Sequence, residues 1–400
     1  MKYAILDASF PITRQSSGVA ALWLKWALRS CGVEPVALDS ADVLLVTCVS
    51  TQQSGYLRKL KTKYRNRIVI AGGPGAYAPY SLGKHADIVC VGEGQVFVET
   101  LIRDGIDACR RLSNSWIDGE NKVVVPCESF PWNCPPIQAE DGVFRVVCGR
   151  GCKRKCKFCQ TGWAVKYREH PDPKALFDSI AKVKKASYRV AYLSNDLAAH
   201  SFSHLLPATE HGSYSLDQIK RIGVPSARQI RIGVEGVSER LRTNVGKPIS
   251  SDDLVNATAW LNGNKKSVRW FMIAGLPHET DDDWMDLQDC VLRWKRKSER
   301  GVLGISFTAF CPQSATPYAT ESLSDAYWAR YEKFTEWFFS GRGWDNRIKL
   351  MNPAEPPGRM RRAILDIGIS ESFLRDGGHV GPNSRVEYPY QKQKTKNATA

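Results

Sequence analysis

Residues Val146–Trp163 read VVCGRGCKRKCKFCQTGW, in which an apolar, strand-like run leads directly into a cysteine-rich loop. On that loop Cys152, Cys156 and Cys159 follow a Cys-x3-Cys-x2-Cys spacing. A cubane 4Fe-4S cluster normally takes four cysteine ligands, so a loop that offers three leaves one iron open to a substrate or cofactor. Lys and Arg residues between these cysteines favour the thiolate form and offset the negative charge of a cluster.

A structural zinc site is the alternative for this triplet. Zinc knuckles and ribbons generally pair two Cys-x2-Cys units or add histidines. No histidine lies within ten residues of the three cysteines. The spacing therefore favours an iron–sulfur cluster, which would be the metal site of this chain.

Strand-like runs recur after the cysteine loop and alternate with helical segments. They lie at Phe144–Val147, Val190–Leu193, Ile230–Val234, Trp270–Ile273 and Ile305–Phe310. Strands that alternate with helices predict a parallel sheet covered by helices. We expect a partial or full β/α barrel over residues 143–330.

The first part of the chain shows the same rhythm. Short apolar runs at Tyr3–Leu6, Val43–Val46, Ile68–Ile70 and Ile88–Val91 alternate with helical patterns such as Ser54–Tyr64. This predicts a Rossmann-like (flavodoxin-like) α/β domain with a parallel sheet over residues 1–117. A linker rich in proline and polar residues follows over residues 118–142.

Three loops after these strands are candidate ligand sites, because open α/β sheets bind ligands at the carboxyl ends of their strands. Glycines in them let a ligand approach the backbone, although a glycine also serves simply to turn the chain. The candidate residues are Thr47, Cys48, Ser50, Gly72, Gly73, Gly75, Gly92, Glu93 and Gly94.

The composition of the 400 residues is that of a globular protein, with 43% hydrophobic and 24% charged residues. No apolar run is long enough for a membrane span and no signal peptide is evident, so we expect no membrane association and a cytoplasmic location. The net charge of +15 makes nucleic acid a candidate partner, with a basic solvated surface as the alternative. Residues 331–400 form a basic C-terminal extension whose end we expect to be disordered.

The cysteine triplet, with Phe158 just before its last member, resembles the signature of the radical S-adenosylmethionine (SAM) superfamily. The resemblance implies that a 4Fe-4S cluster cleaves SAM to a 5′-deoxyadenosyl radical, which abstracts hydrogen from a substrate. It also implies an electron donor such as flavodoxin or ferredoxin. By the superfamily pattern, Glu235 would hold the ribose of SAM and Arg242 its carboxylate. Phe158, Ser194, Asn195, Asp196 and Gly275 would complete the SAM-binding residues.

The first hundred residues resemble the cobalamin-binding-type domain that precedes the barrel in many radical SAM enzymes, through ADVLLVTCVST, IVIAGGPGAYAP and DIVCVGEGQ. The Asp-x-His-x-x-Gly motif of the form with a histidine ligand to cobalt is missing, and His85 is the only histidine there. The resemblance implies cobalamin as a second cofactor and methyl transfer to an unactivated carbon. The alternative is modification of a nucleic acid base without cobalamin. Methylthiolation of tRNA is one such activity, but only Cys48 lies where its second cluster would need cysteines.

Three minor sites complete the candidates. Cys127, Cys134 and Cys148 have no recognised cluster spacing, so an auxiliary cluster is the less favoured interpretation. Cys311 follows the last predicted strand and is either a hydrogen donor or an ordinary loop cysteine. His200 and His204 have a spacing that suits metal ligation on a helix, but solvated histidines are the simpler interpretation.

Overall fold

The computed structural model describes residues 1–9, 18–49, 53–120, 123–139, 141–195, 199–202, 211–225, 227–313, 315–319, 321, 325–340, 346–352, 380–381 and 384–386. Three predicted or candidate site residues, Ser50, Asp196 and His204, lie outside them, as does the predicted disordered end after residue 386. In the described part of the chain, no helix has both the length and the apolar character needed to span a bilayer.

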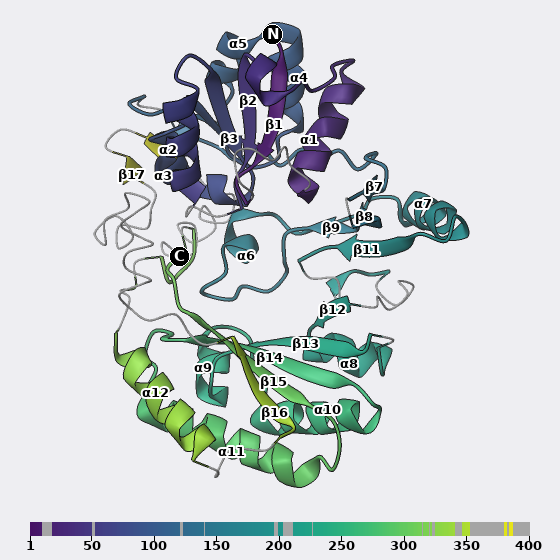
Figure 1. The fold of residues 1–400 in the computed structure, drawn as a ribbon, viewed down its shortest axis with the longest axis vertical. Coiled ribbons are helices and arrows are strands. Elements are labelled where there is room, and N and C mark those ends of the chain that lie inside the picture. The colour runs from purple at the N-terminus through teal and green to yellow at the C-terminus, as the bar shows by residue number, and fades with distance from the viewer. Residues whose placement is uncertain are drawn as a thin grey trace, which may run out of the picture.

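The N-terminal part is the predicted parallel α/β sheet, drawn at the top of Figure 1. Its strands are hydrogen-bonded in the order β1-β2-β3-β4-β5, and only β5 is antiparallel. The elements are β1 (Tyr3–Asp7), α1 (Val19–Ser30), η1 (Leu38–Ser40), β2 (Val43–Thr47), α2 (Ser54–Lys63), β3 (Ile68–Gly72), η3 (Pro74–Tyr77), α3 (Pro79–Gly83), β4 (Ile88–Cys90), α4 (Gln95–Asp104), α5 (Ile106–Arg111) and β5 (Ser115–Trp116).

The segment between α1 and η1 explains why helices cover both faces of this sheet. The Val36 amide donates to the Tyr3 carbonyl (2.9 Å), so this segment runs along the edge of β1 that β2 leaves open. The chain then crosses over β1 to form β2, and the direction of winding reverses there. Helices α1 and α4 pack on one face, and α2 and α3 on the other. This is the doubly wound, flavodoxin-like arrangement, whose ligands bind at the carboxyl edge beside the reversal.

The second half is the predicted barrel, drawn in the middle and at the bottom of Figure 1. One sheet has the order β11-β8-β7 and another the order β12-β13-β14-β15-β16, with every pair of the larger sheet parallel. The strands are β6 (Val123–Val124), β7 (Ile137–Gln138), β8 (Val143–Val147), β9 (Gly149–Arg150), β10 (Arg168–Glu169), β11 (Arg189–Leu193), β12 (His211–Tyr214), β13 (Gln229–Glu235), β14 (Ser267–Ala274), β15 (Leu303–Ala309), β16 (Ile348–Asn352), β17 (Val380–Gly381) and β18 (Ser384–Val386). The helices are α6 (Gln160–Ala164), α7 (Pro173–Lys185), α8 (Leu216–Ile222), α9 (Glu239–Asn244), α10 (Ser251–Gly263), α11 (Asp281–Lys297) and α12 (Ala326–Phe339).

The barrel extends beyond the predicted boundary at residue 330. That boundary lies inside α12, and β16 adds a further parallel strand to β15. The predicted linker also carries structure, because β7 pairs with β8 and β6 pairs with β18 near the C-terminus. These strands are short, and sequence periodicity cannot detect two-residue strands.

Local sequence signals start the barrel helices. Thr280 and Asp283 form a capping box at α11, whose first turn is acidic and whose last turn is basic. The side chain of Asp172 caps α7, with Pro173 at the first helical position. Helix α11 buries its apolar face against the larger sheet, to which Ile232, Trp270 and Phe307 contribute fully buried side chains. Helix α7 packs on the smaller sheet through Leu176 and Ile180.

The two halves touch through a buried ion pair. The Glu93 carboxylate, 7% exposed, follows β4 of the N-terminal sheet and accepts a hydrogen bond from Arg150 Nε of β9 (2.7 Å). Arg168 of β10 lies 3.6 Å from the same carboxylate oxygen. β9 directly precedes the cysteine loop, and its partner β10 follows α6 after the loop. The contact therefore joins the carboxyl edge of the N-terminal sheet to the two strands that flank that loop.

Candidate active site

The cysteine loop lies between β9 and α6 and is tied to its surroundings by backbone contacts. Gly151 adopts φ +69°, and a Cβ there would lie 2.4 Å from the Lys166 carbonyl oxygen, so this position requires glycine. The Lys157 amide donates to the carbonyl of Val245 at the end of α9 (2.9 Å). The Trp163 indole donates to the Cys156 carbonyl (2.9 Å). The loop is therefore held against the carboxyl end of β13.

Cys156 is the buried member of the triplet, while Cys152 and Cys159 are partly exposed. Burial raises the pKa of the Cys156 thiol; the positive charge of Lys247 lowers it, and the Cys159 thiolate raises it. Within the described residues, no three His, Cys, Asp or Glu side chains are gathered closely enough to share a metal ion. The triplet has the donor chemistry that an iron–sulfur cluster requires, and its role as ligand set remains a proposal.

Glu235, the predicted ribose contact, lies beside this loop. It has φ +73° at a bulge of β13, a conformation that a non-glycine residue adopts only when its surroundings hold it there. Its carboxylate receives a hydrogen bond from Lys247 (2.7 Å) and also raises the pKa of Cys156. The strained backbone thus directs a carboxylate and an ammonium group toward the buried thiol.

Arg242 is not placed to hold the SAM carboxylate. Its side chain is fully buried, and its guanidinium donates to the Ile249 carbonyl (2.6 Å), the Gly236 carbonyl (3.3 Å) and the Ser251 hydroxyl (2.7 Å). These bonds tie α9 to the start of α10. The structure therefore gives Arg242 a structural role, and we remove it from the proposed SAM-binding residues.

Gly275 ends β14 with φ +82°, and a Cβ there would lie 2.9 Å from the Tyr327 ring. Its amide donates to the buried carboxylate of Glu279 (2.8 Å), which also receives the Trp284 indole N–H (2.9 Å). Burial raises the pKa of Glu279. Gly275 thus lies against Tyr327 of α12.

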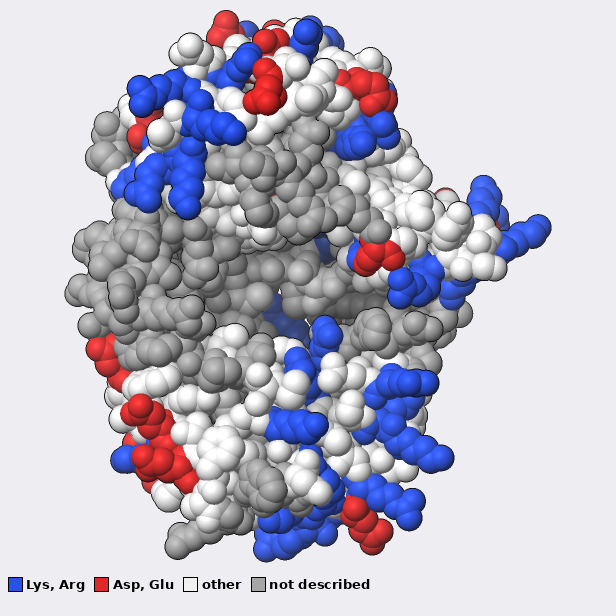
Figure 2. All heavy atoms as spheres, viewed as in Figure 1, with Lys and Arg blue, Asp and Glu red and all other residues white. Residues whose placement is uncertain are grey.

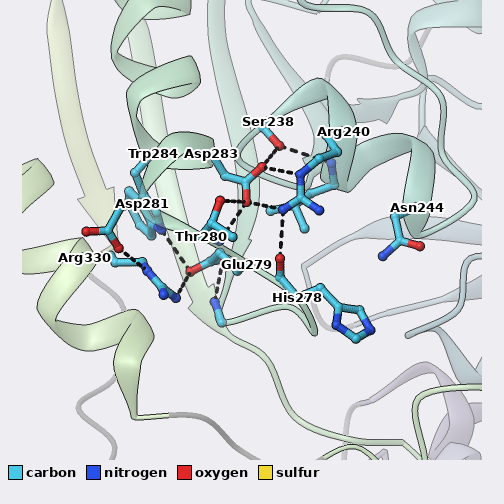
Figure 3. A network of polar contacts seen from close by, with 12 residues as sticks. Ser238, Arg240, Asn244, His278, Glu279, Thr280, Asp281, Asp283, Trp284 and Arg330 are labelled. Carbon is cyan, nitrogen blue, oxygen red and sulfur yellow. Dashed lines mark hydrogen bonds and ion pairs between the residues drawn. The ribbon is translucent and has the colours of Figure 1, made fainter.

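A second carboxylate that sequence reasoning missed lies next to Glu279. Asp283 accepts hydrogen bonds from Ser238, Arg240 and Thr280 and so joins the loop after β13 to the start of α11 (Figure 3). The neighbouring Asp281 accepts a hydrogen bond from Arg330 of α12. The acidic run after Pro277 was the available signal. This network fixes the carboxyl ends of two barrel strands relative to each other.

Ser194, at the end of β11, belongs to a buried chain of polar groups. Its hydroxyl lies 2.7 Å from His200 Nε2, and Tyr167 lies 2.8 Å from His200 Nδ1. Because the Tyr167 hydroxyl donates to Glu169 (2.9 Å), it accepts from His200 Nδ1–H, and the serine hydroxyl donates to Nε2. The expectation that His200 is solvated is wrong, since it is 1% exposed and stacked between Tyr167 and Phe202. Asn195 is exposed, and Phe158 packs against the barrel core.

The candidate cobalamin loops meet at the carboxyl edge of the N-terminal sheet. The Cys48 amide donates to the Gly72 carbonyl (2.7 Å), and the Cys48 carbonyl accepts from Gly75 (2.8 Å). Gly73, with φ +94°, passes so close that a Cβ would lie 2.8 Å from that carbonyl. Thr47 donates to Leu6. The loops after β2 and β3 are therefore one connected surface with close backbone approaches, and the Gly92–Gly94 loop follows β4 at the same edge of the sheet.

The axial side chain for cobalt is not evident on this surface. The Cys48 thiol is fully buried, and burial raises its pKa to about 12. His85 precedes β4 and lies at the opposite edge of the sheet. The carboxylate of Glu93, between Gly92 and Gly94, is paired with Arg150 and Arg168. The described residues at this edge fit a cobalamin only through their backbone groups and small side chains, with no protein ligand to the metal.

Among the residues that the structure describes, the remaining cysteines do not gather into a metal-binding group. Cys127 forms a bridge with Gly92, and burial raises the pKa of Cys134 and of Cys148 to about 12. Burial also raises the pKa of Cys311 to about 11.

Comparison with known proteins places this geometry in context. No family model matches the chain. It is 26% identical over 293 residues to an uncharacterised protein of Methanocaldococcus jannaschii, and the match covers 67% of this chain and 65% of that protein.

The structure is similar to TsrM from Kitasatospora setae, a radical SAM methyltransferase. The form with tryptophan substrate and a SAM analogue matches with a TM-score of 0.59 and 14% identity, covering 100% of this chain and 99% of TsrM. The form with cobalamin and a 4Fe-4S cluster matches with a TM-score of 0.55 and 14% identity, covering 80% and 74%. The chain therefore has the fold of the radical SAM enzymes in which a cobalamin-binding-type domain precedes the barrel.

Proposed function

We propose that this chain is a radical SAM enzyme that transfers a methyl group from cobalamin to an unactivated carbon of its substrate. The observation that carries the proposal is the place of the Cys152–Cys159 loop. It packs against the end of α9, near Glu235 and Lys247, and the paired strands β9 and β10 that flank it contact the carboxyl edge of the N-terminal sheet. When bound, a cluster supplies the electron that cleaves SAM, and cobalamin supplies the methyl group.

The chain's own residues would bind and orient these groups. Cys152, Cys156 and Cys159 would supply thiolates, and the ammonium of Lys247, which lowers the pKa of Cys156, would favour the ionised thiol there. Glu235 has carboxylate oxygens that can accept from the hydroxyls of a ribose. Ser194, held by His200, would contribute a hydroxyl at the end of β11.

Apolar side chains at the junction of the two halves would exclude water. Ala76 and Tyr77 of the N-terminal sheet belong to the same buried cluster as Ala164 of α6 and Ala315. Reactive intermediates need such a dry environment, because water and protons would otherwise quench them.

The experiment is anaerobic reconstitution of the full chain with iron and sulfide, followed by addition of dithionite and SAM. We expect the absorption and paramagnetic resonance of a 4Fe-4S cluster, and formation of 5′-deoxyadenosine. Replacing Cys152, Cys156 and Cys159 by alanine should abolish both signals, whereas Cys134→Ala, outside the triplet, should keep them. A protein that binds only zinc, or a triple variant that still forms 5′-deoxyadenosine, would contradict the proposal.

Cobalamin is tested separately. Protein produced with hydroxocobalamin in the medium should copurify with a corrinoid, seen in its visible spectrum. Enzyme that forms 5′-deoxyadenosine and takes up no corrinoid would keep the radical SAM activity and reject methyl transfer from cobalamin.

Modification of a nucleic acid base is the second candidate, and the net charge of +15 favours it. In that case the logarithm of RNA affinity should fall with the logarithm of salt concentration by about 0.7 to 0.9 per phosphate neutralised. A flat salt response would remove this candidate.

A further inference from the structure

The barrel sheet has an apolar face covered by helices and a polar face opposite it. Along β13–β16, alternate residues such as Ile230, Trp270 and Ile305 belong to the core beneath α10, α11 and α12. The residues between them point to the other face, the inner face, which is directed toward the N-terminal half (Figure 1).

One row of residues across the inner face carries three positive charges. The register aligns Arg231 of β13 with Arg269 of β14, Arg269 with Gly304 of β15, and Gly304 with Lys349 of β16. At Gly304 a Cβ would lie 3.5 Å from Arg269 Cγ and 3.0 Å from Met351 Cγ. The glycine therefore leaves room for the Arg269 side chain to lie across the sheet.

These cations have no acidic partner in the part of the chain that the structure describes. None of the ion pairs found there involves Arg231, Arg269 or Lys349. In the same residues, the Arg269 Nε atom is buried without a hydrogen-bond acceptor. Leaving a buried charged donor unsatisfied is costly, so such groups normally have a partner when the protein is functional.

A second unsatisfied group lies one row further along the strands. Ser306 aligns with Phe271 on the inner face, is 1% exposed, and its hydroxyl has no partner among the described residues. The Arg269 guanidinium carbon lies 5.9 Å from the centre of the Phe271 ring, so arginine, aromatic ring and serine are neighbours. A buried hydroxyl beside an unpaired guanidinium is a donor pair suited to an oxyanion.

We propose that Arg231, Arg269, Lys349 and Ser306 bind an oxyanion, the acid group of this enzyme's substrate, on the inner face of the barrel. The assignment of that oxyanion to the substrate rests on the proposed function; the anion site itself does not. Figure 2 shows a hollow between the two halves, with Lys and Arg side chains inside it and along its lower rim. The site takes a carboxylate or a phosphate, since both present oxygens that a guanidinium can bind in a bidentate manner.

The distance along β13 from Arg231 to the Glu235 carboxylate limits the substrate's size. The Glu235 carboxylate folds back over Gly233, where a Cβ would lie 2.5 Å from its Oε1 atom. Gly233 is two residues beyond Arg231 on β13, which is about 7 Å at the usual strand rise. The acid group and the proposed SAM ribose site are thus separated by the length of a small organic acid or a phosphate monoester, so a small molecule fits better than a polymer.

The test measures binding of two probes, inorganic phosphate and citrate, to the full chain as purified, by isothermal titration calorimetry at constant ionic strength. We expect saturable binding of at least one probe, weakened at least tenfold in Arg269→Gln and in Arg231→Gln. Arg296→Gln is the matched control, because it removes the same charge from the exposed end of α11. Its affinity should equal that of the wild type.

Each outcome has a meaning. Binding of phosphate alone assigns the site to a phosphate ester, and binding of citrate alone assigns it to a carboxylic acid. No saturable binding, or equal weakening in the Arg296→Gln control, would overturn the proposal. Arg231 is exposed, so its variant keeps the test valid if Arg269→Gln fails to fold. No cluster, SAM or cobalamin is needed, so failure here is separate from absence of 5′-deoxyadenosine in the reconstituted enzyme.

Discussion

Replacing Glu93 by glutamine should weaken the contact between the N-terminal sheet and the cysteine loop. The carboxylate is 7% exposed and accepts from Arg150 at 2.7 Å, with Arg168 at 3.6 Å. A hydrogen bond to a charged group contributes about 1.5–3 kcal/mol. Glutamine retains one neutral hydrogen bond, and Arg150 is 35% exposed and partly hydrated, so we expect a loss of about 2 kcal/mol.

The loss can be measured by urea unfolding, followed through tryptophan fluorescence. With a dependence of about 1–3 kcal/mol per molar urea, the midpoint should fall by roughly 1 M. A double-mutant cycle with Arg150→Gln should give a coupling energy of about 1–2 kcal/mol. Glu99→Gln, at an exposed position on α4, the helix that follows Glu93, is the control and should change stability by no more than about 0.5 kcal/mol. Equal midpoints for the Glu93 and Glu99 variants, or no coupling to Arg150, would refute this account of the domain contact.

Two further predictions concern buried groups. Arg242→Met should lower the free energy of unfolding by about 3–5 kcal/mol, because it leaves the Ile249 and Gly236 carbonyls and the Ser251 hydroxyl without their donor, at about 1–3 kcal/mol for each unsatisfied buried group. Arg296→Met should have little effect. Unchanged urea stability with loss of SAM binding would instead restore Arg242 as a SAM contact. Cys311 should react with iodoacetamide about tenfold faster per pH unit up to about pH 11, because burial raises its pKa to about 11 and only the thiolate reacts. Mass spectrometry of digests from pH 7 to pH 11 checks this, and a rate that levels off by pH 9 would contradict it.

Much of the fold follows from local patterns. The strand-like runs at Ile68–Ile70 and Trp270–Ile273 lie inside observed strands, because continuous or alternating apolar residues report burial directly. β16 was missed because its residues Ile348–Asn352 lie in a basic stretch without clear alternation, and only pairing with β15 makes them a strand. Tertiary context overrides weak local preference at such places.

In the candidate site, too, the sequence predicted some residues correctly and could not predict others. Cys152, Cys156 and Cys159 are close in sequence, so their spacing alone predicts their chemistry. Arg242 has the right residue type at the right place in the chain, but its guanidinium is directed into the protein by Ile249 and Ser251. No spacing rule reports which way a side chain turns.

By itself, the amino-acid sequence determined the cysteine triplet, the order of strands and helices, and the excess of positive charge, because each depends on residues close together in the chain. The tertiary structure alone decided that Glu93 joins the two halves, that Glu235 lies beside Cys156, and that Arg231, Arg269 and Lys349 form one row. The physical reason is that contacts between residues far apart in sequence depend on strand register and side-chain packing, which exist only once the whole chain has folded.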